Sequence, residues 1–175
     1  MTVSYNFATA WESIADAQPE VRALVQGDRV VSWGDFDDRA ARLAQGLLDR
    51  GVGQGAKVAS YLYNSNEYME GVFATWKLRG APVNVNYRYL EDELLYLVDN
   101  SDAEVLLFHG VLAEHVARIM DRAATVKVWV FPDWTVIGVG VTLTIGVACA
   151  VPDKPSSASA PSGADSPFGN SRKNT

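Results

Sequence analysis

The sequence predicts an α/β fold, in which an N-terminal β-hairpin precedes a partial parallel βαβ sheet and an irregular tail follows at the C-terminus. Four strand-like runs begin at residues 57, 82, 104 and 126, and a helical pattern fills each gap. Intervals of 22 to 25 residues with helices between them are typical of crossovers that join parallel strands. Two earlier strand-like runs are joined only by Gly27 and Asp28, which favours a hairpin.

The first elements follow from local patterns. A short helix is expected over about residues 8–17, because Phe7 and Trp11 begin an apolar series on one helical face. Residues 21–26 and 29–33 are rich in β-favouring side chains. The two residues that connect these runs begin with glycine, which fits a type II′ turn.

A longer helix is expected after the hairpin. Ser32 suits the N-cap, with Asp35 in the position of a capping box, and an apolar stripe continues to about Arg50. Asp37 and Asp38 add two more carboxylates to the first turn. A metal-binding acid cluster is one interpretation, but carboxylates facing water also match the positive end of the helix dipole, and we favour the second interpretation.

The glycine-rich segment 51–55 does not predict a dinucleotide site. A phosphate-binding glycine loop leaves a strand and opens a helix. This segment instead leaves a helix and opens the predicted strand at 57–63. We interpret it as a helix C-cap followed by a turn.

The next crossover, residues 67–89, carries the clearest pattern in the chain. Asn64 and Glu67 are expected to cap its helix and Gly80 to stop it, while Pro82 opens a short strand. The apolar residues of this helix recur at i, i+3, i+4 and i+7: Met69, Val72, Phe73 and Trp76.

The last two crossovers repeat this alternation. Helices are expected over residues 90–98 and about 112–120, and strands over 104–109 and 126–130. Three acids at 91–93 again match a helix dipole better than they match a catalytic pair.

Composition excludes several classes of function. The 175 residues are 48% hydrophobic and carry a net charge of −6, so the chain suits one folded domain and offers no basic surface for nucleic acid. The single cysteine, Cys149, forms no internal disulfide, which fits a cytoplasmic location. The first residues lack a charged and an apolar region of the secretory type, so no signal peptide is expected.

The pattern predicts three parts. Residues 1–130 form the folded unit, 131–151 an apolar segment, and 152–175 a disordered tail rich in Ser, Ala, Pro and Gly. Within the apolar segment, residues 134–151 carry no charge. Three interpretations stay open for them: a membrane span, β-structure, or an out-of-frame or rearranged tail, of which the last is favoured.

Few side chains outside the helix starts suggest a site. His109 and His115 lack the spacing of a metal-ligand set, their nearest acids in sequence are Glu104 and Glu114, and both are expected to be structural. The run Tyr87-Arg88-Tyr89 is expected to be a packed loop, with contact to an anionic ligand, or stacking on one, as the alternative.

Three blocks occur in an order typical of one enzyme superfamily. Residues 31–36 (VSWGDF) form the first block, and residues 51–60 (GVGQGAKVAS) the loop and strand after it. Residues 78–89 (LRGAPVNVNYRY) form the second, and residues 90–109 continue in the same style. From about residue 7 to 130 the chain resembles the adenylate-forming (AMP-binding) superfamily, in its fatty-acyl-CoA ligase branch.

The resemblance implies a cytoplasmic enzyme that makes an acyl-adenylate from a carboxylic acid and ATP with Mg, then passes the acyl group to coenzyme A. The family grips the phosphates with a loop rich in Ser, Thr and Gly that ends in Pro-Lys-Gly and should follow soon after Val130. The nearest run, residues 156–163, has no threonine, one glycine and no lysine behind it. The later acidic blocks and the lysine of the family's C-terminal domain are not in the chain either.

We therefore expect a truncated N-terminal fragment of an acyl-CoA ligase that is inactive alone. No catalytic, cofactor-binding or metal-ligating residue is assigned, and ATP, Mg and CoA belong to the full-length family. The alternatives are a non-catalytic binding or membrane-tethered module that uses residues 134–151, or one half of a split ligase completed by another chain. An exposed sheet edge is expected to favour self-association or aggregation, and membrane binding is not expected.

Overall fold

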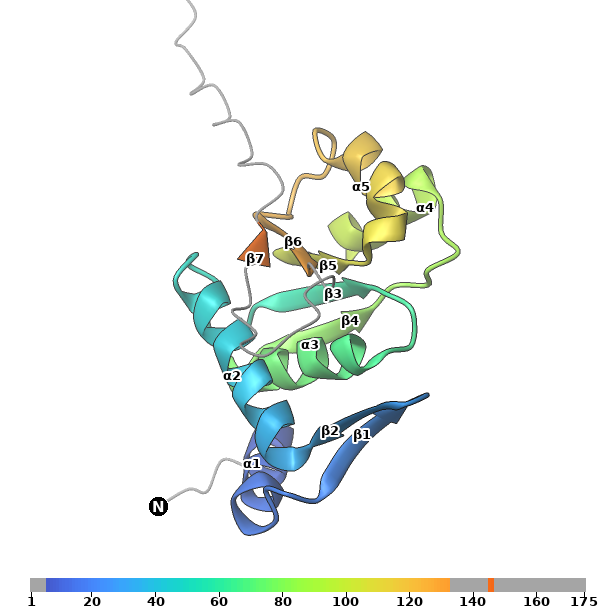
Figure 1. Ribbon diagram of the computed structural model, residues 1–175. Helices are drawn as coiled ribbons and strands as arrows, with labels where there is room; N and C mark the ends of the chain where they lie inside the picture. Colours follow the sequence, from blue (N-terminus) through green and yellow to red (C-terminus); the bar gives the residue numbers. More distant parts are fainter. Residues whose placement is uncertain (1–5, 133–144, 147–175) are drawn as a thin grey trace, which may run out of the picture.

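A computed structural model describes residues 6–132 and 145–146 (Figure 1). Within these ranges the helices are α1 (Phe7–Ala17), α2 (Trp33–Leu48), α3 (Asn66–Lys77), α4 (Glu91–Asn100), a 3-10 turn η1 (Gly110–Leu112) and α5 (Ala113–Ile119). The strands are β1 (Arg22–Gln26), β2 (Arg29–Ser32), β3 (Lys57–Tyr61), β4 (Ala81–Asn84), β5 (Val105–Phe108), β6 (Val128–Pro132) and β7 (Ile145–Gly146). Every helix and strand expected between residues 7 and 130 is present, with ends shifted by a few residues.

The main sheet has the strand order β4-β3-β5-β6-β7. Strand β3 pairs in parallel with β4 and β5, so that Val58 lies opposite both Pro82 and Val105. Strand β6 continues the parallel arrangement on β5, and β7 runs antiparallel to β6. The predicted parallel sheet is confirmed.

Helices cover both faces of this sheet, α2 and α3 on one side and α4 and α5 on the other (Figure 1). Strand β5 divides its side chains between the two cores, because Val105 and Leu107 join the first and Leu106 and Phe108 the second. All four side chains are at most 3% exposed. A strand buried on both faces needs an unbroken apolar run, and this explains the near-continuous apolar sequence of β5.

The hairpin β1–β2 forms its own antiparallel sheet beside α2 and α3. Gly27 has a φ of 57°, whereas Asp28 is not in the positive-φ region, as a type II′ turn requires. Helix α1 completes this end of the molecule through Trp11, whose ring lies 5.5 Å from that of Phe36 and 5.1 Å from that of Phe73. The first helix therefore packs onto α2 and α3 through Trp11, and its Phe7 ring also lies 4.8 Å from that of Trp76 on α3.

The predicted start of α3 is corrected by one position. Its N-cap is Ser65, whose hydroxyl accepts a hydrogen bond from the Tyr68 N–H at 3.3 Å, and Asn64 lies outside the helix. Asparagine and serine both suit an N-cap, so residue type alone does not choose between Asn64 and Ser65. The choice depends on where the chain turns away from β3 to begin the helix. Glu67 pairs with Arg29 of the hairpin at 2.5 Å and also forms a hydrogen bond with Ser65. Burial alone would raise the pKa of Glu67, but hydrogen bonds from the main chain and from Arg29 outweigh it and lower that pKa.

The predicted role of Gly80 at the end of α3 is also corrected. The residue in the left-handed region is Arg79, with φ 57°, and not the glycine. Gly80 is needed because a Cβ atom there would lie 2.5 Å from the Ala56 carbonyl oxygen. The same carbonyl accepts a hydrogen bond from the Ala81 N–H at 2.9 Å, so the two backbones must approach closely where β4 begins beside β3.

Candidate functional site

The carboxyl ends of β3, β4 and β5 lie at one edge of the parallel sheet. Strand β3 lies between β4 and β5. Helix α3, which follows β3, packs on one face of the sheet, whereas α5, which follows β5, packs on the other. In open α/β sheets, ligands bind where the connections from neighbouring strands diverge in this way.

Three rings form a row across this edge. Tyr63 follows β3, and its ring centroid lies 4.9 Å from that of Tyr87, which follows β4. On its other side it lies 5.3 Å from the ring of His109, which follows β5. Both tyrosines are 39% exposed, so part of the row faces solvent. The sequence placed Tyr63 inside a strand and offered no sign of its contact with the other two rings.

Arg88 adds a cation to the row. Its guanidinium carbon lies 5.6 Å from the centre of the Tyr87 ring. The residue is exposed, and it forms no ion pair with any other residue in the described ranges. A guanidinium on an aromatic ring can bond to phosphate or carboxylate oxygens and can stack on a planar group.

Tyr61 and Asn86 hold the connection that carries these residues. The Asn86 side chain accepts a hydrogen bond from the Arg88 N–H at 3.0 Å, and its carbonyl accepts one from the Tyr89 N–H at 3.0 Å. The buried Tyr61 hydroxyl donates to the Tyr89 carbonyl at 2.5 Å. Burial raises the pKa of Tyr61, with smaller effects from neighbouring Glu91 and Tyr63, so the hydroxyl remains a donor near neutral pH.

Both histidines contact groups of this chain through their Nδ1 atoms. The Nδ1 atom of His109 accepts a hydrogen bond from the Val111 N–H at 3.4 Å at the start of η1. The Nδ1 atom of His115 lies 3.2 Å from a Glu91 carboxylate oxygen, which also accepts a 2.6 Å hydrogen bond from Arg118. The acid that His115 meets in the fold is thus 24 residues away, and it is not the sequence neighbour Glu114.

The three acids at the start of α2 point to different partners. Asp35 bonds to the N-cap serine, Asp38 pairs with Arg42 at 2.7 Å, and Asp37 pairs with Lys77 of α3 at 2.8 Å. Asp37 is therefore partly buried in a contact between helices, where the sequence placed it in water. No group of three side chains with metal-ligand character exists in the described part of the chain.

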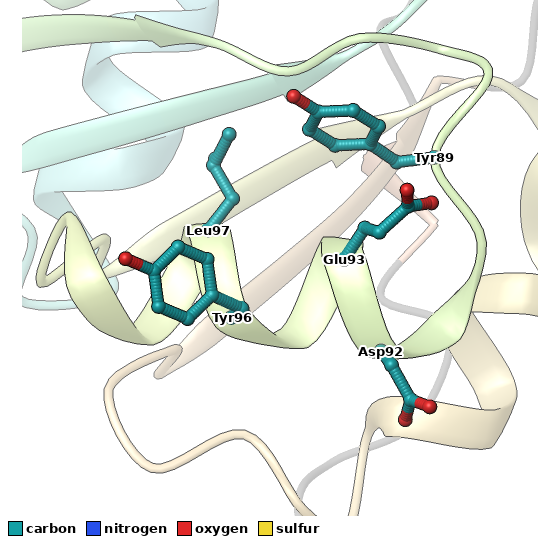
Figure 2. Close-up of a pocket in the computed structure, with 5 residues that line it drawn as sticks. All are labelled: Tyr89, Asp92, Glu93, Tyr96 and Leu97. Carbon is teal, nitrogen blue, oxygen red and sulfur yellow. The ribbon is translucent and has the colours of Figure 1, made fainter.

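A pocket of about 370 Å³ lies beside α4 (Figure 2). It is lined by Tyr89, Asp92, Glu93, Tyr96 and Leu97, and Figure 2 shows Asp92 pointing away from the other four. Both carboxylates are already engaged. Asp92 accepts from Arg122 at 3.1 Å, and Glu93 accepts from the Leu90 N–H at 3.1 Å. The pocket lies beside the first part of α4, and its lining residues add no reactive group to the row of rings.

Several predicted features lie outside the described residues. These are residues 1–5, the serine-rich run 156–163, the tail 152–175 and most of the uncharged run 134–151. Of that run only β7 is described. None of the described helices is both long and apolar enough to cross a membrane.

Comparison with known sequences identifies a consistent set of relatives. The family model described as AMP-binding enzyme matches residues 11–157. A medium/long-chain-fatty-acid–CoA/3-oxocholest-4-en-26-oate–CoA ligase of Mycobacterium marinum is 38% identical over 127 residues, which cover 73% of this chain and 23% of that protein. A 3-oxocholest-4-en-26-oate–CoA ligase of Rhodococcus rhodochrous is 38% identical over 125 residues, covering 71% of this chain and 22% of the relative.

Solved structures give the same answer for the fold. The N-terminal domain of FACL13 from Mycobacterium tuberculosis superposes with a TM-score of 0.69 at 24% identity, over 74% of this chain and 34% of that chain. The Mycobacterium tuberculosis fatty acyl CoA synthetase gives a TM-score of 0.69 over 73% of this chain and 26% of that chain. The chain thus spans about a quarter of the length of its curated relatives.

Proposed function

Because this chain belongs to the family of AMP-binding enzymes, we propose that it supplies the N-terminal segment of a fatty-acyl-CoA ligase. Such a ligase converts a carboxylic acid, ATP and CoA to acyl-CoA, AMP and pyrophosphate through an acyl-adenylate. The observation that carries the proposal is the 38% identity over 127 residues to a ligase named for fatty acids and a steroid acid. The substrate class is accordingly a hydrophobic carboxylic acid.

The 175 residues alone do not carry out adenylation in this proposal. Attack of a carboxylate on the α-phosphate passes through a highly charged transition state, which needs backbone amides, cations and Mg²⁺ around the phosphates. The printed sequence contains no Pro-Lys-Gly run, and no described residues form a metal-ligand group. In this proposal the phosphate-binding loop that ends in Pro-Lys-Gly and the Mg²⁺ site are supplied by other sequence.

The row formed by Tyr63, Tyr87 and His109 has a binding role in the proposal, together with Arg88. Its exposed cation lies over an aromatic ring at the divergence point of the sheet. That combination suits a phosphorylated adenine nucleotide, the chemistry that ATP and CoA share. In the proposal the Arg88 guanidinium donates hydrogen bonds to a phosphate, and the Tyr87 ring stabilises the guanidinium through a cation–π contact.

A chimera tests the central claim. Residues 1–130 replace the corresponding segment of the Mycobacterium marinum ligase, and acyl-CoA formation from a fatty acid is measured. We expect an active chimera, and a folded but inactive one contradicts the proposal. The 175-residue chain alone is expected to show no fatty-acid-dependent ATP–pyrophosphate exchange, so exchange above the no-enzyme control contradicts the claim of inactivity.

Arg88 is tested in the same chimera. Replacing Arg88 by Ala should raise the KM for ATP or for CoA, and the affected substrate identifies the nucleotide bound. Removing a charge-assisted hydrogen bond predicts a change of roughly tenfold. Arg42 is an exposed arginine of α2, and its replacement by Ala serves as the matched control. Equal kinetics for the two variants exclude the proposed contact.

A cytoplasmic location completes the proposal, since the family's two nucleotide substrates, ATP and CoA, are both used there. Expression in cells followed by fractionation should leave the chain in the soluble fraction. Recovery in a membrane pellet after a carbonate wash contradicts this location.

A further inference from the structure

We propose that Tyr61 is a positioning residue, whose hydroxyl holds the connection between β4 and α4 so that Tyr87 and Arg88 stay over the edge of the sheet. Its functional consequence rests on the nucleotide contact proposed above for Arg88. The positioning itself rests only on the geometry of the described residues.

The anchor is rigid. Tyr61 is the last residue of β3, the strand between β4 and β5, and it is 0% exposed. Its ring belongs to the core beneath α4 and α5. A buried tyrosine ring needs an acceptor for its hydroxyl, and here the acceptor is the main-chain carbonyl of Tyr89, 28 residues further along the chain. The hydrogen bond therefore joins a fixed strand to a connection that contains a turn but no helix or strand.

The Val85 N–H, at the start of this connection, donates a hydrogen bond to the Ser60 carbonyl of β3 at 3.1 Å, whereas the other hydrogen bonds of residues 86–90 are local. Asn86 accepts both from the Arg88 N–H and from the Tyr89 N–H, and Glu93 accepts from the Leu90 N–H. These bonds fix the shape of the turn, but they do not attach it to the sheet. Within the described ranges, the Tyr61 hydroxyl makes the hydrogen bond that attaches residues 86–90 to β3.

A second contact, from Tyr63 just after the end of β3, also holds the connection. Tyr63 lies two residues after Tyr61, and its ring contacts Tyr87 edge-on at 4.9 Å. The connection is therefore held at Tyr87 by a ring and at Tyr89 by a hydroxyl, and Arg88 lies between the two points. Loss of the hydroxyl removes one of the two contacts that flank Arg88 and lets the guanidinium leave its place.

The variant Tyr61→Phe removes one oxygen atom and keeps the ring. Tyr96→Phe is the matched control, because it removes the hydroxyl of a tyrosine on α4 that is 70% exposed. Amide hydrogen exchange is measured for the full chain and both variants, and each is titrated separately with Mg-ATP and with CoA. In Tyr61→Phe the Tyr89 carbonyl loses the hydroxyl that donates to it. We therefore expect amide exchange at Arg88 and Tyr89 to be about tenfold faster, relative to core strand amides, and nucleotide binding to be about tenfold weaker.

The outcomes separate this inference from the proposed function. If Tyr61→Phe changes exchange at residues 88–90 no more than Tyr96→Phe does, relative to the amides of β5, the positioning role is overturned. If the wild-type chain binds neither nucleotide, the proposed contact fails, while the exchange comparison still decides the role of Tyr61. If Tyr61→Phe does not fold, amide exchange of the wild-type chain decides the question. Exchange of the Arg88 and Tyr89 amides at the rates of an unstructured peptide would show that the connection is not held, and would overturn the positioning role.

Discussion

Arg39 and Glu70 form a two-point ion pair inside the molecule. Arg39 Nε lies 2.7 Å from one carboxylate oxygen of Glu70 and Nη2 lies 3.2 Å from the other. The arginine side chain on α2 is 16% exposed and the glutamate side chain on α3 is 2% exposed. Burial raises the pKa of Glu70, and its hydrogen bonds with Arg39 oppose that rise. The contact between α2 and α3 therefore contains a charge that is tolerated only while its partner is present.

Replacing Arg39 by Met should lower the free energy of unfolding by about 3 kcal/mol at pH 7, because it leaves a buried carboxylate without its main partner. Urea unfolding measures the loss. A carboxyl group whose pKa is raised in the folded state lowers the stability at pH values above its unfolded pKa of 4.5, where folding holds an ionised carboxylate in the interior. As the pH falls toward 4.5 Glu70 becomes protonated, so the loss caused by Arg39→Met should shrink. The control is Arg42→Met on the same helix. Its pair with Asp38 is exposed, so a loss below about 0.5 kcal/mol is expected, and equal losses would refute the buried pair.

Gly80→Ala should cost about 2 kcal/mol, because the new methyl group would lie 2.5 Å from the Ala56 carbonyl oxygen and force β3 and β4 apart. Gly53→Ala is the control. A Cβ atom at Gly53 meets nothing within 4 Å, so this change should be neutral or slightly stabilising. Thermal unfolding of both variants compares the two sites. Similar melting temperatures would mean that the close approach of the strands is relieved at no cost.

Glu91 should titrate far below an ordinary glutamate. A hydrogen bond with its own main chain, followed by those from His115 and Arg118, lowers its pKa from 4.5 to about 2. A lowered pKa contributes stability above the unfolded value, and this contribution is lost as the pH falls from 4.5 through about 2. Carbon-13 NMR of the labelled carboxyl group measures the midpoint. Arg118→Ala should raise it, whereas Arg122→Ala, which acts on Asp92, should leave it unchanged.

Lys77 ties α1 and α2 to α3. Its Nζ atom lies 2.8 Å from carboxylate oxygens of both Glu12 and Asp37, and the side chain is 12% exposed. Burial alone would lower the pKa of Lys77, but the hydrogen bonds with the two acids outweigh it and raise that pKa. Its contribution to stability is therefore complete below the unfolded value of 10.5 and is lost as the pH rises through the folded value.

Lys77→Met should lower the free energy of unfolding by about 1 kcal/mol at pH 7, because two partly exposed ion pairs are lost. Tryptophan fluorescence during urea unfolding reports the change, since Trp11 packs between the same helices. Lys57→Met removes a more exposed pair with Asp102 and serves as the control. A larger loss for the control variant would contradict the role of Lys77.

Local patterns predicted much of this fold. The pattern at residues 104–109 predicted a strand, and the structure places one there whose side chains enter both cores. Gly27 predicted the hairpin turn through its freedom to adopt positive φ. The cap of α3 and the role of Gly80 were predicted wrongly. Ser65 and Asn64 are equivalent as caps by residue type, and the need for a glycine at position 80 comes from a backbone that is distant in sequence.

The amino-acid order alone determined the helices, the strands, the parallel sheet and the family of this chain, because burial periodicity and turn chemistry act over a few neighbouring residues. Only the tertiary structure decided that the rings of Tyr63, Tyr87 and His109 form one row and that Tyr61 reaches the main chain at Tyr89. These residues meet because β3 lies between β4 and β5. Strand order depends on packing across the whole sheet, so no local sequence pattern predicts it.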